Sequence, residues 1–292
     1  MPSDSNDYLL ERRLQQLNPS LHQRFKDTVF VMQRSLSKFQ RLFPEYTDHS
    51  VFHSLNVLAF CNVLIGPAQL QQMNESELYV LLMGCYLHDT GMSISQKDYE
   101  QFKDALGAAE YFAGAEDASV ADFVRDKHQE FSACYINKYA DMLEIPSDEA
   151  LFAITQVARG HRRTDLYDEE AYPADLRMQN GDIVHLPYLA SLIRLADEID
   201  VIADRNPKLL YDIESLTDAV QVVYHKVLAA VPRMDIEEKM FLLHVDTDDQ
   251  MISIVIEKMV EKMQSTLDYC RDVTARRTPY RITQEWVRMQ RK

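Results

Sequence analysis

The chain has 292 residues, with 31 lysines and arginines against 46 aspartates and glutamates, which gives a formal charge of −15. This acidic balance argues against a protein that binds long nucleic acids through a basic face, and a hydrophobic content of 46% excludes a wholly disordered chain. Seven glycines and ten prolines are too few for a fold built mainly from strands and turns. We therefore expect a mainly helical protein.

Helical periodicity covers most of the first 230 residues. Apolar residues recur at spacings of three and four over 20–42, and a second, more apolar helix is expected over 51–65. Asn74, with Glu77 three residues later, forms a capping-box pattern that starts a helix ending near His88. Further helices are predicted over 96–112, 118–143, 148–160, 188–204 and within 208–230.

Two segments depart from this helical pattern. Residues 164–186 are polar and aperiodic, which indicates a loop long enough to act as a lid or a specificity element. After residue 230, two β-branched runs flank Asp246–Gln250, which predicts a hairpin, and a last helix is predicted over 255–276. We therefore expect an α-helical domain over 1–230 and a small α+β extension over 231–292, which could mediate a homo-oligomer.

The sequence carries no signal for a membrane or for export. The first residues have neither the basic region nor the apolar core of a signal peptide. The longest apolar stretches, near Val57–Ile65 and Val80–Leu87, are too short to span a bilayer. Four widely spaced cysteines are typical of a reduced protein, so we expect a cytoplasmic location.

Histidines and aspartates in and beside apolar helices carry the functional signal. His53 lies one turn into a helix, His88 and Asp89 are adjacent at a helix end, and Asp197 lies inside an apolar helix. A carboxylate in such a helix is costly to bury unless it is paired or binds a metal. Imidazole nitrogens and carboxylate oxygens suit zinc, manganese and iron, so we expect a metal site inside a helical bundle.

The order of these residues resembles the H…HD…D signature of the HD-domain superfamily of metal-dependent phosphohydrolases. The matching strings are HSLNV from His53, LHDTGM around His88-Asp89 and SLIRLADEID around Asp197, and the resemblance covers residues 45–205. The HD-x-G-M form is similar to HD domains found beside Hsp90-like ATPases, although this sequence shows no ATPase. The fold that the resemblance implies is an all-α HD-domain helical bundle, here followed by the C-terminal extension of hairpin plus helix.

The resemblance also implies one or two divalent ions per chain, with manganese, zinc, iron, nickel and magnesium as candidates. The residues that would bind the first ion are His53, His88, Asp89 and Asp197. Asp89 would bridge to a second ion bound by His128 and His161. Metal-activated hydroxide would then attack a small phosphorylated substrate, such as a nucleotide or another phosphoester. His49 competes with His53 for the first position, and Asp200 is interpreted as a structural partner.

One position departs from the family pattern. Many HD enzymes have a lysine after HD-x-G, where this chain has Met92. A cation for the phosphate must then come from elsewhere, and we expect Arg162 and Arg163, which follow His161, to act with Asp89 in catalysis. Three alternatives remain open: a di-iron oxygenase, a non-enzymatic metal-stabilised sensor or partner-binding domain, and a nuclease acting on single strands.

Overall fold

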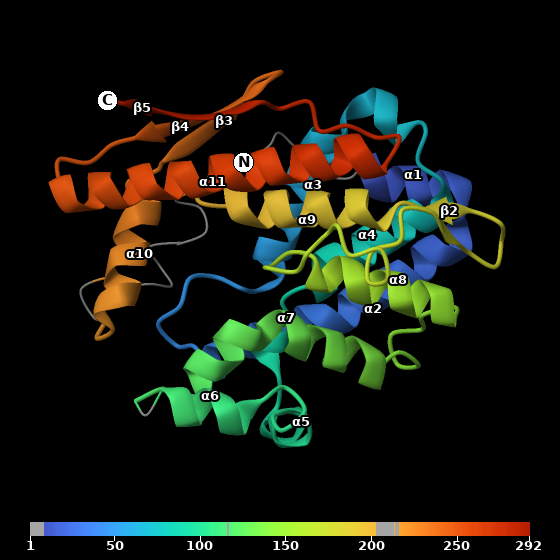
Figure 1. Ribbon diagram of the computed structural model, residues 1–292, viewed down its shortest axis with the longest axis horizontal. Coiled ribbons are helices and arrows are strands. Elements are labelled where there is room, and N and C mark those ends of the chain that lie inside the picture. The colour runs from blue at the N-terminus through green and yellow to red at the C-terminus, as the bar shows by residue number, and fades with distance from the viewer. Residues whose placement is uncertain (1–8, 116, 203–212, 214–215) are drawn as a thin grey trace.

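The computed structural model describes residues 9–115, 117–202, 213 and 216–292, which form a helical body with two small sheets (Figure 1). The α-helices are α1 Leu9–Leu17, α2 Pro19–Leu36, α3 Val51–Leu70, α4 Glu75–Leu87, α5 Gln96–Phe102, α6 Ala108–Gly114, α7 Val120–Lys138, α8 Asp148–Arg159, α9 Leu186–Ile199, α10 Ala219–Ala229 and α11 Gln250–Arg277. The 3₁₀ turns are η1 Ser37–Arg41 and η2 Thr90–Ser93. The strands are β1 Leu176–Arg177, β2 Ile183–Val184, β3 Arg233–Ile236, β4 Met240–Val245 and β5 Trp286–Arg291.

Local signals in the sequence determine where several helices begin. The capping box predicted at Asn74 is confirmed, because its side chain accepts from the Glu77 amide and the Glu77 carboxylate accepts from the Asn74 amide. A second capping box joins Ser119 and Asp122 at the start of α7. Pro187 lies in the first turn of α9, where a missing N–H group leaves no helical hydrogen bond unmade. Helices α7 and α9 carry the predicted ligands His128 and Asp197, and α4 leads directly into His88 and Asp89.

Helix α4 lies at the centre of the body. Every residue from Ser76 to Leu87 is buried, and the helix contacts α2, α3, α8 and α9. A β-carbon at Gly84 would lie 2.7 Å from Ile193 Cδ1 and 2.9 Å from Val157 Cγ1, so the glycine permits the close packing of α4 with α9 and α8. Because α4 is enclosed on all sides, the His88-Asp89 pair at its end lies deep inside the protein.

The C-terminal extension packs on the body through α11. This helix runs alongside α9 (Figure 1), and its buried residues Ile256, Met263 and Leu267 belong to the same hydrophobic core as the body. The sheet has the order β3-β4-β5, with β3 antiparallel and β5 parallel to β4. The predicted all-α bundle with a small α+β extension is therefore confirmed, while the domain boundary near residue 230 stays a prediction.

The hairpin predicted around Asp246–Gln250 is wrong. The first β-branched run forms β4, but the Asp249 carboxylate accepts from the amides of Met251 and Ile252 and starts α11, five residues before the predicted start. Ile252 and Ile256 are buried four residues apart on one helical face. The N-cap and the helical periodicity outweigh the β propensity of the second run, and β4 pairs instead with β3 and β5.

Other helices differ from the prediction in extent. The helix predicted over 96–112 is split into α5 and α6, and Gly107 before α6 has a left-handed φ of 81°. The helix predicted over 20–42 ends as the 3₁₀ turn η1, and α1 was not predicted. Helix α10 confirms the helix predicted within 208–230, and residues 208–212 and 214–215 of this range lie outside the described residues.

Judged by length and composition alone, helix α3 is long and apolar enough to cross a membrane. The apolar stretch considered from the sequence is shorter and lies within this helix, so it does not predict a segment of this length. Half of its apolar 18-residue window is buried inside the protein. Its first turn carries the buried His53, and its backbone leaves helical geometry at Gly66, where φ is 67°. These are properties of a core helix and are compatible with a non-membrane protein.

The loop predicted over 164–186 is attached to the body at both ends. The Leu166 amide donates to the Tyr269 hydroxyl of α11 at 2.7 Å, and the Asn74 side chain donates to the Ile183 carbonyl at 2.7 Å. Between these points, β1 and β2 pair as a short hairpin. Its role as a lid or specificity element stays a prediction.

Candidate metal centre

Six side chains predicted as metal ligands meet at the C-terminal end of α4. They come from the first turn of α3, the end of α4, the middle of α7, the residue pair after α8 and the last turn of α9. In chain order they are His53, His88, Asp89, His128, His161 and Asp197. All but Asp197 are buried, and Asp197 keeps 19% of its side chain exposed. The structure thus brings every predicted ligand together, and metal binding by these residues is developed below as a proposal.

The first group of donor atoms surrounds the ring of His53. Its Nε2 lies 3.1 Å from Asp197 Oδ1, 3.3 Å from His88 Nε2 and 3.4 Å from Asp89 Oδ2. His88 Nε2 and Asp89 Oδ2 are 3.5 Å apart. Ligands bound about 2.1 Å from one ion in tetrahedral geometry are about 3.4 Å apart. His53, His88 and Asp197 therefore form one set of mutually close donors that a divalent ion could bind, and Asp89 Oδ2 borders this set from the side of His53 and His88.

The second group uses the other oxygen of Asp89. Asp89 Oδ1 lies 3.5 Å from His128 Nε2 and 3.7 Å from His161 Nε2. The two imidazole nitrogens are 2.8 Å apart. Because Oδ2 faces the first group and Oδ1 faces the second, Asp89 is placed to bridge two ions.

The hydrogen bonds behind the rings determine which nitrogen faces the centre. The Nδ1 atoms of three rings lie 2.6–3.0 Å from the carbonyl oxygen three residues earlier, in the pairs His88–Cys85, His128–Arg125 and His161–Ala158. A carbonyl oxygen only accepts, so Nδ1 carries the proton and Nε2 keeps its lone pair. Two such lone pairs 2.8 Å apart repel each other. A bound cation removes this repulsion, so the donor set fits a metal.

The electrostatic environment favours the unprotonated form of Asp89, His128 and His161. Burial lowers the pKa of His128 to about 4, although the charge of Asp89 opposes the shift. Burial, together with His128 and His88, holds the pKa of His161 well below its usual range. Burial acts to raise the pKa of the Asp89 carboxyl, but His88 and His49 outweigh it and keep this pKa well below its usual range. Neutral imidazole and ionised carboxylate are the forms that bind metals.

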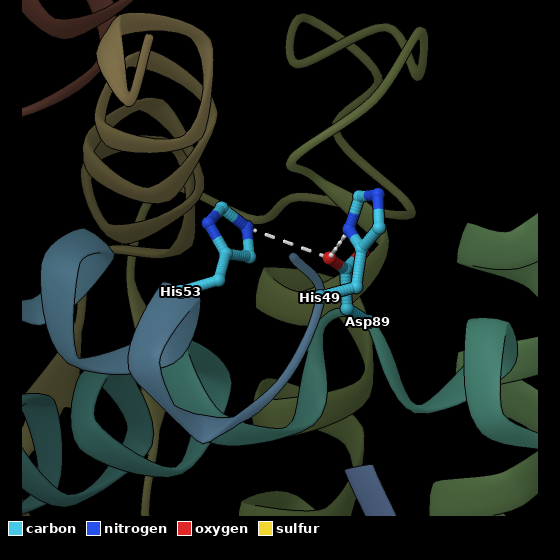
Figure 2. A group of neighbouring side chains, drawn as sticks. All are labelled: His49, His53 and Asp89. Atoms are coloured by element: carbon cyan, nitrogen blue, oxygen red, sulfur yellow. Dashed lines mark hydrogen bonds and ion pairs between the residues drawn. The ribbon is translucent and has the colours of Figure 1, made fainter. Parts of the chain in front are cut away.

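His49 and His53 both point toward Asp89, as Figure 2 shows. His49 Nδ1 lies 2.9 Å from Asp89 Oδ2, whereas His53 directs Nε2 to Asp89 and Asp197. Behind His53, the buried Asp200 carboxylate lies 2.7 Å from Nδ1 and also accepts from Asn56. This confirms Asp200 as a structural partner. The geometry favours His53 as the ligand, with Asp200 orienting it, and His49 as a residue that holds Asp89.

The turn after His88-Asp89 depends on Gly91. A β-carbon at this position would lie 2.1 Å from the carbonyl oxygen of His128, so only glycine allows the turn to approach α7 this closely. The Gly91 amide donates to Ser132 Oγ at 2.8 Å, and Ser132 Oγ donates to the His88 carbonyl at 2.5 Å. Ser132 was missed from the sequence, although it follows His128 by four residues on the same helical face.

The cations expected near the site occupy different environments. Arg162 is half-buried and its charge contributes to the low pKa of His128, whereas Arg163 is exposed. Among the described residues, neither guanidinium has a hydrogen-bond or ion-pair partner. Met92 is 1% exposed and packs in an apolar cluster with Phe39 and Phe131. The position that carries lysine in many HD enzymes is therefore a core position here.

The geometry of the centre agrees with the result of a family comparison. No curated protein and no solved structure matches the chain significantly, so the subgroup suggested by the HD-x-G-M motif stays a prediction. The model of one family, HD-CE, matches residues 43–288. The match includes all six predicted ligands and extends beyond the resemblance over 45–205 to most of the C-terminal extension. The chain therefore belongs to the HD-CE family.

Proposed function

We propose that the protein is a metal-dependent phosphohydrolase that hydrolyses a nucleotide or another small phosphoester at this His/Asp centre. The observation that carries the proposal is the shared carboxylate of Asp89, which presents one oxygen to each group of donors. Divalent ions bound as such a pair would activate water and neutralise the charge that develops on the phosphoryl group.

Each residue of the centre would have a role that follows from its position. His53, His88 and Asp197 would hold one ion, and His128 and His161 would hold the other, with Asp89 between them. The half-buried Arg162 would bind a phosphate oxygen through its guanidinium fork, since it has no partner among the described residues. The exposed Arg163 would attract the anionic substrate from further out. The imidazole donors suit iron, zinc or nickel and the carboxylates also suit manganese, whereas magnesium prefers a site made of oxygen ligands.

Three alternatives remain for comparison. A di-iron oxygenase and a metal-stabilised sensor would use the same donors, and no feature of the described residues favours either. A nuclease acting on single strands would need free cations around the centre. Arg125, one candidate, is instead stacked between the rings of Tyr46 and Tyr224 at 4.9 and 5.6 Å, which gives the nuclease less support than a small substrate.

The test is a turnover assay on the full chain, purified without chelator and supplied with manganese. A panel of nucleotides and bis-(p-nitrophenyl) phosphate is assayed with and without EDTA. We expect EDTA-sensitive hydrolysis, and a larger increase in KM for Arg162→Met than for the matched variant Arg163→Met. Two bound irons with oxygen consumption and no hydrolysis would replace the proposal with the oxygenase. Bound metal with neither activity would replace it with the sensor.

A further inference from the structure

A cavity of about 610 Å³ lies among α2, η1, the segment from η2 into α5, and α7 with the turn that follows it. None of the six predicted metal ligands lines it. Its volume falls within the roughly 300–1,000 Å³ of small-molecule sites. It is therefore a candidate binding site separate from the metal centre.

Two cations line this cavity from η1. Lys38 and Arg41 are three residues apart, and in a 3₁₀ helix residues at this spacing lie directly above one another. Like charges at this spacing repel each other. In the part of the chain that the structure describes, neither side chain has a hydrogen-bond or ion-pair partner, although the chain carries a net charge of −15. Both side chains are exposed at the edge of the cavity, so their charges are available to an anion that enters it.

The remaining lining combines apolar surface with a neutralised carboxylate. Ile94, Tyr99, Tyr135 and Leu143 contribute apolar or aromatic surface. Asp98 is the acidic residue of the lining, and its oxygens are bound by Lys138 at 2.7 Å, Tyr139 at 2.9 Å and Ser95 at 2.6 Å. Because this carboxylate is already paired, the positive charge of η1 dominates the cavity.

We propose that this cavity binds a small organic anion with an aromatic or apolar body. The body would fill the space beside Tyr99, Tyr135 and Leu143, and the phosphate, sulfonate or carboxylate of the ligand would be bound between Lys38 and Arg41. The site does not depend on the metal centre or on the proposed hydrolase activity.

The test uses 8-anilinonaphthalene-1-sulfonate, an aromatic sulfonate without a phosphoester bond, in fluorescence titrations of the full metal-loaded chain. We expect one saturable site per chain. The double variant Lys38→Gln/Arg41→Gln should raise the Kd about tenfold through the loss of two charge-assisted contacts. Lys97→Gln is the matched control, because Lys97 is an exposed lysine between two lining residues and does not line the cavity itself. Its Kd should stay unchanged.

Two further titrations distinguish this cavity from other apolar surfaces. The uncharged analogue N-phenyl-1-naphthylamine should bind the wild type more weakly than the sulfonate and should be insensitive to the cation variants. Equal Kd values for the sulfonate in the double variant and in Lys97→Gln would overturn the proposal. So would a loss of sulfonate binding in Asp89→Asn with no loss in the double variant, since the probe would then occupy the metal centre. Thermal unfolding of each variant checks that the fold is intact.

Discussion

Replacing Asp200 by asparagine tests whether Asp200 orients His53 for metal binding. The buried Asp200 carboxylate lies 2.7 Å from His53 Nδ1 and 3.1 Å from the Asn56 amide nitrogen, so it accepts from both. An asparagine has the same size but only one acceptor oxygen. If that oxygen accepts from His53, its NH₂ group faces the NH₂ group of Asn56. In the reverse orientation the NH₂ group faces His53 Nδ1 and moves the ring proton to the nitrogen that should bind the metal.

The size of the effect follows from the role of such partners. Loss of a hydrogen-bond partner behind a metal-binding histidine typically costs 10- to 100-fold in metal affinity, which corresponds to about 1.4–2.8 kcal/mol. We expect the Asp200→Asn variant to fall in the upper half of this range. Its hydrogen bond to His53 is charge-assisted, and both side chains are fully buried.

The assay is competition for the metal against a chelator of known affinity, with the full chain in each case. Asp175→Asn is the matched control, because Asp175 also faces a histidine, His185, at 3.6 Å but is 72% exposed. The control should bind metal like the wild type, and far-UV circular dichroism should be the same for all three proteins. Equal metal affinity in Asp200→Asn and the wild type would refute the assignment of His53 as a ligand oriented by Asp200.

Three further perturbations test the centre and the turn that supports it. Gly91→Ala should lower the free energy of unfolding by about 3 kcal/mol, because the added β-carbon would clash with the His128 carbonyl. Gly114→Ala is the control and should change this free energy little, because nothing lies within 4 Å of the added carbon. Urea unfolding measures both variants. In metal-free protein the free energy of unfolding should fall as the pH drops from about 6.5 to about 4, since the unfolded chain protonates His128 near 6.5 and the folded chain only near 4. The part of this loss due to His128 should be on the order of 3 kcal/mol, so His128→Gln should lose less stability than the wild type over this range, while His161, whose pKa is also lowered, contributes in both proteins. A flat pH profile of the wild type in EDTA would contradict this prediction. His88→Ala should lose bound metal and keep its far-UV spectrum, and full metal content in that variant would contradict its role as a ligand.

The sequence predicts the body of this protein well where local signals and helical periodicity agree. The capping box at Asn74 lies where it is expected, and the apolar helix that carries Asp197 exists as predicted, although it spans Leu186–Ile199 rather than 188–204. The second β-branched run after Asp249 was assigned to a strand because its propensity is for strands. In the structure, the Asp249 cap and burial against the body make it helical. Such tertiary contacts are not visible in local sequence.

The candidate site was likewise predictable in part: its ligands could be selected from the sequence, but the contacts that orient them could not. Motif spacing was enough to select six residues that converge, even though they are separated by up to 144 positions in the chain, from His53 to Asp197. The hydrogen bonds that orient these residues could not be predicted from the sequence. Carbonyl partners such as Cys85 O and the bridge through Ser132 depend on backbone geometry at the end of α4, which no side-chain pattern encodes. The core position of Met92 likewise follows only from packing.

Metal content is the measurement that tests the central claim most directly. Elemental mass spectrometry on full chain purified without chelator should find about two divalent ions per chain, as expected for two donor groups that share Asp89. The isosteric variant Asp89→Asn should lose at least one of them, because one amide oxygen cannot serve both groups. A wild-type chain that stays metal-free after incubation with manganese, iron and zinc, or an Asp89→Asn variant with full metal content, would contradict the account.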